Sequence, residues 1–122
     1  MSNAAAISDI LIAFSGNRCP LNNEKTAQVC IADMLASRGY NASREHRLSA
    51  ADILDFFLPD IGLVIEVKLK GAQKVAVFKQ LERYADHPEV KAIMLATNLA
   101  MGLPSYINDK PTYYVSLGAA WL

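Results

Sequence analysis

Apolar residues recur at spacings of three and four in three stretches of the chain, which is the period of an amphipathic helix. The first stretch predicts a helix over Ala4–Phe14, ended by the turn residues that follow it. The second predicts a helix that is capped by Asn22 or Asn23 and closed at Gly39, because glycine tolerates the left-handed backbone there. The third predicts a helix over Ala76–Ala85.

Strand-forming residues gather in the middle and in the last part of the chain. The runs Asp52–Leu58 and Leu63–Leu69 flank a turn at residues 59–62, so we expect them to pair as an antiparallel hairpin. Other strand-like runs lie at 40–48, 90–97 and 112–116. The segment 98–109 is mixed, with a short helix as one interpretation. Helices that alternate with strands predict an α/β fold, with a central mixed sheet of about five strands flanked by helices.

Length and composition indicate one globular domain. The 122 residues are 52% hydrophobic and 20% charged, which excludes an intrinsically disordered chain. We expect a single domain over 1–122, in which residues 1–20 form an N-terminal helical extension. Twelve basic and twelve acidic side chains give a net charge of zero. This balance argues against a polycation-like mode of binding but leaves room for a local basic face.

The expected compartment is the cytoplasm. No apolar run reaches the roughly 20 residues that a membrane span requires, and the apolar start of the chain lacks the basic residues of a secretory signal. The two cysteines, Cys19 and Cys30, are too few for a disulfide framework or a zinc site. We therefore expect both cysteines to be reduced thiols, and we expect no membrane partner.

The predicted hairpin brings two acids face to face. A turn centred between Asp60 and Ile61 places Asp55 directly across from Glu66, with Cβ atoms ~5 Å apart. Carboxylates at that separation repel each other, and one of them is expected to have a raised pKa unless a cation lies beside it. Lys68 lies on the same face of its strand as Glu66. Two interpretations follow: an ordinary Glu66–Lys68 ion pair on a solvated face, or a site for a divalent metal ion.

The apolar neighbours of the two acids favour the metal site. Residues 56–58 and 63–65 are all apolar, as in a strand pair buried on both faces. A charged group is costly there unless it is paired or bound to a metal ion. Mg²⁺ is commonly held by one or two carboxylates together with water and substrate phosphate. A lysine beside such a site, here Lys68, can position or deprotonate an attacking water, or stabilise charge on a phosphate.

The spacing of these residues resembles a nuclease signature. Asp55, separated by ten residues from Glu66–Lys68, resembles the Asp…Glu-x-Lys motif of the PD-(D/E)XK superfamily. That superfamily includes restriction endonucleases, archaeal Holliday-junction resolvases and RecB-type exonucleases. Gln80 and Tyr84 are similar to the Gln-x-x-x-Tyr motif of RecB-like members. The order of elements over residues 24–97 resembles the αβββαβ core of that fold, and the compact layout resembles small phage-type nucleases.

The resemblance implies a restriction endonuclease-like fold and a Mg²⁺-dependent deoxyribonuclease, in which Mn²⁺ would substitute and DNA is the partner. Asp55 and Glu66 would hold the metal ion, completed by the Val67 carbonyl. Glu24 would match a metal-associated glutamate on the preceding helix, although a first-turn acid is also stabilised by the helix dipole alone. The implied catalytic residues are Asp55, Glu66, Lys68 and Gln80.

One departure from the motif concerns its first acid, which usually follows a proline. Here Leu54 precedes Asp55, and Asp52 is a second candidate for the same role. The alternation of side chains along the strand favours Asp55, because Asp52 shares a face with Leu54. A register shifted by one residue would reverse this preference.

Basic residues follow the hairpin and would suit a phosphate backbone. The residues expected to bind nucleic acid are Lys70, Lys74, Lys79, Arg83 and Tyr84. The alternative for the lysines and the arginine is a solvated face of a surface helix. For Tyr84, the alternative is a boundary position in which the ring packs on the sheet.

Two other functions stay open. A net charge near zero favours a nuclease-fold module that binds nucleic acid or a protein without catalysis. The small size favours a nuclease subunit that requires a partner, and a homodimer is one form of this arrangement. The presence of Asp55, Glu66 and Lys68 together favours catalysis, because a non-catalytic module has no need of all three.

Overall fold

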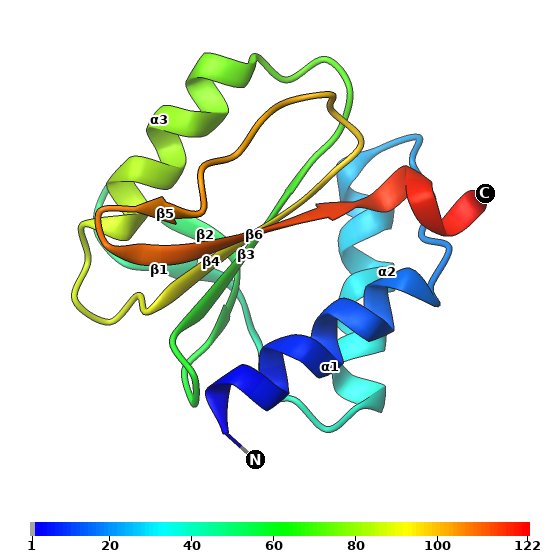
Figure 1. Ribbon diagram of the computed structural model, residues 1–122, viewed down its shortest axis with the longest axis horizontal. Helices are drawn as coiled ribbons and strands as arrows, with labels where there is room; N and C mark the ends of the chain where they lie inside the picture. The colour runs from blue at the N-terminus through cyan, green and yellow to red at the C-terminus, as the bar shows by residue number, and fades with distance from the viewer. Residues whose placement is uncertain (1) are drawn as a thin grey trace.

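The structure, a computed structural model, describes residues 2–122. Its helices are α1 (Asn3–Ser15), α2 (Glu24–Ser37), α3 (Lys74–Ala85) and the 3-10 helix η1 (Leu117–Trp121). Its strands are β1 (Ser43–Arg47), β2 (Ile53–Leu58), β3 (Leu63–Lys68), β4 (Ala92–Thr97), β5 (Tyr106–Ile107) and β6 (Lys110–Ser116). The predicted α/β class is confirmed: helices flank a mixed sheet, which has six strands where about five were expected (Figure 1).

The strands lie side by side in the order β1-β2-β3-β4-β6-β5. β2 and β3 form the predicted antiparallel hairpin, with Phe56 opposite Ile65 and Leu58 opposite Leu63. β3, β4 and β6 run parallel, and α3 provides the crossover from β3 to β4. Parallel strands are usually covered by helices on both faces, and β3 and β4 are accordingly buried almost throughout.

Each face of the sheet packs against its own helices (Figure 1). Alternate residues of β3 divide between the two faces: Leu63, Ile65 and Val67 pack with α1 and α2, whereas Val64 packs with α3. Ile10 of α1 is fully buried in the first of these cores, so the N-terminal helix belongs to the core. None of the helices within residues 2–122 has the length and the apolar character needed to cross a membrane.

The prediction for the cysteines and the helical interpretation of the segment 98–109 are both wrong. Cys19 and Cys30 are not reduced thiols: they form a disulfide, with Cα atoms 5.6 Å apart. The bond ties the connector that follows α1 to the middle of α2. The segment 98–109, all of which the structure describes, holds no helix and leads from β4 into the short strand β5.

Candidate functional site

Asp55 and Glu66 meet where the regular pairing of β2 with β3 ends. The ladder stops at Phe56 and Ile65. Beyond it the Asp55 N–H donates a hydrogen bond to Glu66 Oε1 at 2.7 Å, and the Val67 N–H donates to Asp55 Oδ2 at 2.8 Å. The predicted register is therefore confirmed, and the two carboxylates replace main-chain groups in holding the strands together.

Strand β2 is irregular at Asp55. β1 pairs with β2 at Leu54 and at Phe56, but within residues 2–122 no pair joins Asp55 to Glu45, whose φ is +49°. Leu54 packs on the α3 side of the sheet, whereas Phe56 packs on the other side. Residues two apart on a regular strand would share a face. The distortion accompanies an Asp55 side chain that reaches along the sheet to the Val67 N–H.

Burial dominates the electrostatics of this acid pair. The Glu66 side chain is 1% exposed, and burial together with the charge of Asp55 raises its pKa to about 8. Burial also raises the pKa of Asp55, and the charge of Glu24 adds to that shift. The ammonium of Lys68 lies 3.8 Å from Glu66 Oε2 and lowers the pKa of both acids, but it does not offset burial. The pair is short of positive charge.

A polar cleft of about 360 Å³ opens beside the pair. Lys68 at the end of β3 lines it, together with Glu24 from α2 and Gln80 and Arg83 from α3. Asn23, one of the two predicted caps, accepts a hydrogen bond at the start of α2 and so fixes where the helix begins. The structure thus brings Glu24, Lys68 and Gln80 to one cleft, with the acid pair adjacent through Lys68.

The oxygen donors of the pair fit Mg²⁺ in part. Asp55 and Glu66 supply two carboxylates, and Mg²⁺ commonly takes one or two carboxylates and keeps several waters. Among residues 2–122, no three His, Cys, Asp or Glu side chains lie close enough together to form a metal site by themselves. Glu24 therefore does not join Asp55 and Glu66 in one ligand group, which differs from the predicted set.

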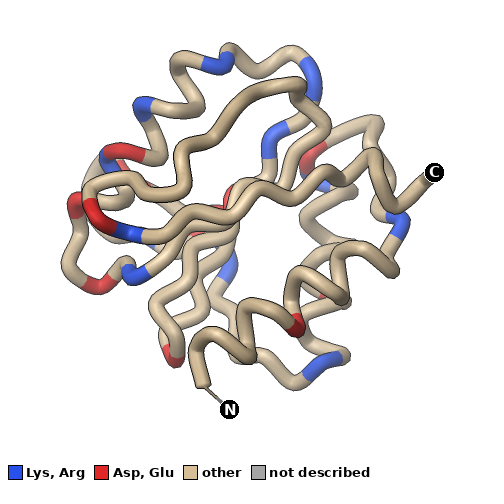
Figure 2. Tube along the Cα trace, viewed as in Figure 1, with Lys and Arg blue, Asp and Glu red and all other residues tan. Residues whose placement is uncertain are grey.

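The basic residues predicted to bind nucleic acid do not all reach the cleft. Lys and Arg positions recur along α3 and the segment before it (Figure 2), but of the predicted set only Arg83 lines the described cleft. Lys74 lines a separate hollow beside Phe78. Lys70 and Lys79 are exposed and line neither. Because α3 presents only one of its faces to the cleft, Arg83 is the one residue of the predicted basic set that lines it.

Tyr84 is not placed to contact nucleic acid. Its side chain is 1% exposed, and its hydroxyl donates a hydrogen bond to the Ile53 carbonyl at 3.1 Å. Burial, followed by the negative charges of Glu66 and Asp55, raises its pKa. The prediction of a contact role is contradicted, and the alternative of a tyrosine packed on the sheet is confirmed. The ring joins α3 to β2 next to the acid pair.

A second polar cluster, which was not predicted from the sequence, lies at the end of α3. Arg83 Nε donates to Asp52 Oδ1 at 3.1 Å, and His87 Nε2 lies 3.0 Å from Asp52 Oδ2. The hydrogen bond with His87 is the main cause that lowers the pKa of Asp52, against the effect of burial. Asp52 is bound by these partners, whereas Asp55 is the acid that lies beside Glu66. The spacing of four between Arg83 and His87 is the signal from which the cluster could have been predicted.

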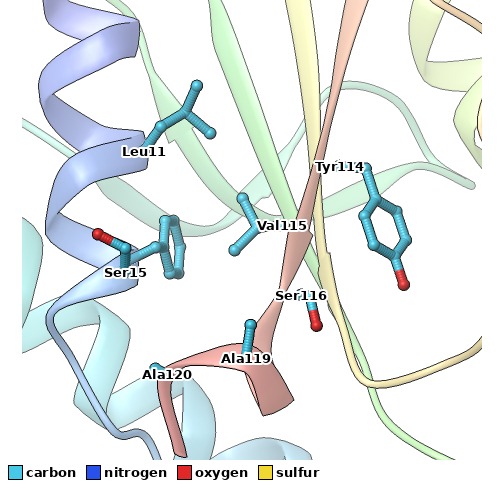
Figure 3. A pocket seen from close by; sticks show the side chains of 8 residues that line it. Leu11, Ser15, Tyr114, Val115, Ser116, Ala119 and Ala120 are labelled. Carbon is cyan, nitrogen blue, oxygen red and sulfur yellow. The ribbon is translucent and has the colours of Figure 1, made fainter. Parts of the chain in front are cut away.

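Another hollow, of about 240 Å³, lies between α1, β6 and η1 (Figure 3). Leu11 of α1 and Val115 of β6 line it, while the Tyr114 side chain points to the other side of the strand. The Tyr114 hydroxyl donates to the Leu99 carbonyl. None of the residues that line this hollow is a carboxylate, a lysine or a histidine, so the polar cleft remains the candidate site.

In comparisons with protein-family models, with curated proteins and with solved structures, the chain has no match. The likeness to the PD-(D/E)XK superfamily stays a prediction from the residues quoted above.

Proposed function

We propose that the chain is a Mg²⁺-dependent deoxyribonuclease of the PD-(D/E)XK type that acts at the cleft beside Asp55 and Glu66. The observation that supports it is the buried carboxylate of Glu66 beside the partly buried carboxylate of Asp55, with Lys68 3.8 Å from Glu66 and lining a polar cleft. Two adjacent acids, one buried and one partly buried, cost stability when they are short of positive charge. Groups with pKa values perturbed in this way, at a cleft, are typical of functional sites.

Asp55 and Glu66 would hold the metal ion, and water would fill the remaining positions. When bound, Mg²⁺ supplies charge stabilisation at the phosphate and a more acidic water. A cation beside the two carboxylates would also favour their ionised forms, because an opposite charge nearby lowers the pKa of an acid.

Lys68 and Gln80 would act on the water and the phosphate. The Lys68 side chain is 19% exposed, so its ammonium can serve the cleft while it remains close to Glu66. An ammonium in that position can orient an attacking water or stabilise negative charge that develops on the phosphate. The neutral amide of Gln80, on the wall that α3 forms, has donors and an acceptor with which to orient the same water.

A second function is favoured by a different property of the same acids. Asp55 and Glu66 each accept a main-chain hydrogen bond, and no third acid within residues 2–122 completes a ligand group. Acids that are satisfied in this way suit a nuclease-fold module that binds nucleic acid or a protein without catalysis. The small number of basic side chains in the cleft also suits a nuclease subunit that requires a partner, including a second copy of this chain.

Cleavage assays separate these functions. The protein is incubated with supercoiled plasmid, linear duplex, single-stranded and branched DNA, each with Mg²⁺, Mn²⁺ or EDTA. We expect cleavage with either metal ion and none with EDTA, and the preferred substrate identifies the subclass. Lys68→Ala and Asp55→Asn should lower the rate by about 10²-fold or more. The matched control is Lys91→Ala, which changes an exposed lysine at the opposite end of the parallel strands.

Two results would contradict the proposal. Cleavage that survives in Lys68→Ala and Asp55→Asn would locate the activity outside this cleft. A complete lack of cleavage, with folded protein and every substrate, would favour the binding module or the subunit that requires a partner.

A further inference from the structure

Arg83 is held at one end of its guanidinium and open at the other. It lies in the last turn of α3, where its Nε donates to Asp52 Oδ1 at 3.1 Å. The Asp52 side chain is 8% exposed, whereas the Arg83 side chain is 52% exposed. The arginine therefore reaches from a buried acid to the solvent.

Asp52 is itself fixed from several directions. Its second carboxylate oxygen lies 3.0 Å from His87 Nε2. Its N–H donates to Ser49 Oγ at 3.1 Å, and its carbonyl accepts from the Leu48 N–H at 2.8 Å. Asp52 thus joins the turn between β1 and β2 to the end of α3. An acid anchored in this way sets the direction of the arginine that it binds.

The open side of Arg83 belongs to the polar cleft. Arg83 lines this cleft together with Lys68 and Gln80. Within residues 2–122, Nε is the only guanidinium nitrogen of Arg83 that has a hydrogen-bond acceptor. The N–H groups of the two terminal nitrogens, Nη1 and Nη2, have no acceptor there. A guanidinium presented like this is a planar fork that matches two oxygens of a phosphate, which the point charge of a lysine does not reproduce.

We propose that Arg83, oriented by Asp52, is the phosphate-binding arginine of the cleft and takes two non-bridging oxygens of a DNA phosphodiester beside Lys68. This inference rests on the proposed function and adds a subsite to it. Asp52 and His87 are positioning residues that touch the arginine or its anchor and not the DNA. Because the chain has zero net charge, affinity would depend on a few well-oriented cations more than on a broad basic surface.

Binding without cleavage tests the subsite. In a Glu66→Gln background the amide oxygen can still accept the hydrogen bond from the Asp55 N–H. The affinity for a fluorescein-labelled duplex in Mg²⁺ is then measured by anisotropy. Arg83→Lys keeps the charge but loses the fork, and we expect it to weaken binding about tenfold. The matched control is Arg38→Lys, because Arg38 lies at the C-terminal end of α2, away from the cleft, and pairs with Asp9 at 3.2 Å. The affinity of this variant for the duplex should not change.

A double-mutant cycle tests the positioning role of Asp52. Asp52→Asn should weaken binding about fivefold when Arg83 is present and should add no further loss in the Arg83→Ala background. A merely structural role would weaken both backgrounds equally. Thermal unfolding of every variant confirms that the proteins compared are folded at the assay temperature.

The outcomes separate this inference from the nuclease proposal. If the wild-type chain cleaves DNA and Arg83→Lys binds as tightly as Arg38→Lys, the subsite is overturned and the nuclease proposal stands. If binding depends on Arg83 but the wild-type chain cleaves nothing, the phosphate site stands and the nuclease proposal is overturned. If the folded wild-type chain neither binds nor cleaves DNA, both are overturned.

Discussion

Asp52 and Glu66 are both buried carboxylates, but their surroundings have opposite effects on their charge. Asp52 has an arginine against one oxygen and a histidine against the other, and the hydrogen bond with His87 is the main cause that lowers its pKa. Glu66 lies beside another acid, Asp55, and burial is the main cause that raises its pKa to about 8.

The comparison distinguishes an acid that stabilises the fold from one that destabilises it. A buried charge whose partners are in place is tolerated, and removal of one partner is costly. A buried acid beside another acid destabilises the folded state whenever it is ionised. Active sites commonly contain groups of the second kind, and their neutralisation commonly stabilises the protein at the expense of function. Loss of charge should therefore act in opposite directions at Asp52 and at Glu66.

The largest expected effect on stability is that of Asp52→Ala. It removes the hydrogen bonds to Arg83 and His87 and should lower the free energy of unfolding at neutral pH by about 2 kcal/mol. Denaturant titration measures this change. Asp33→Ala alters an exposed acid on α2 and should change the free energy by less than about 0.5 kcal/mol. Equal effects of the two substitutions would show that the Asp52 cluster does not stabilise the fold.

Glu66→Gln should have the opposite sign. The pKa of Glu66 is raised from 4.5 to about 8 in the folded chain, so between these values the folded state binds the proton more tightly than the unfolded state. The stability of the metal-free wild type should therefore fall as pH rises from about 5 to about 9. At the alkaline end, Glu66→Gln should be more stable than the wild type by on the order of 1 kcal/mol. Thermal unfolding in EDTA across this pH range measures the pH dependence of the wild type and the difference in stability between the two proteins. The expectation would be contradicted if the stabilities of the two proteins changed with pH in the same way.

The stabilisation of the folded chain by Mg²⁺ should be the smallest of these effects, and it should distinguish Glu66 from Asp52 directly. At a concentration near its Kd, it should stabilise the wild type by about 0.4 kcal/mol at mildly alkaline pH. The gain should persist in Asp52→Asn, disappear in Glu66→Gln and be reversed by EDTA. The measurement is the shift in Tm. Equal shifts in all three proteins would indicate binding elsewhere on the surface.

The acid pair could be predicted because it depends on local structure. A tight turn and the alternation of side chains fix the register of a hairpin, and Asp55 and Glu66 are only eleven residues apart. The roles of Glu24 and Gln80 at the site were predicted from the resemblance to the PD-(D/E)XK superfamily and not from the spacing of the two residues in the sequence. Their helices pack on opposite faces of the sheet, and a periodic pattern does not fix how two helices are placed relative to each other.

The other differences between prediction and structure concern the residues of α3 and the disulfide, and they arise from the way α3 and the connector between α1 and α2 pack. One buried stripe of α3 at helical spacing consists of Val77, Leu81 and Tyr84, so the burial of the tyrosine could have been predicted from the pattern. That Lys74 and Lys79 lie outside the cleft depends on the rotation of the helix about its axis, which the pattern does not fix. The disulfide depends on the path of the connector that carries Cys19, which contains no periodic pattern from which to predict it.

The two borders of the sheet bear on how copies of this chain behave at high concentration. The outer strand β1 carries Arg44, Glu45 and Arg47, and the other outer strand, β5, is only two residues long. Charged or very short outer strands resist the addition of a further strand. Amyloid-like stacking of the folded chain should therefore be slow to begin at β1. At the other border β5 pairs only with Lys110 and Pro111, so within residues 2–122 the rest of the outer edge of β6 has no strand partner. If two copies of the chain paired through their sheets, this edge of β6 would be the place, and the sheet would then set the distance between their two clefts.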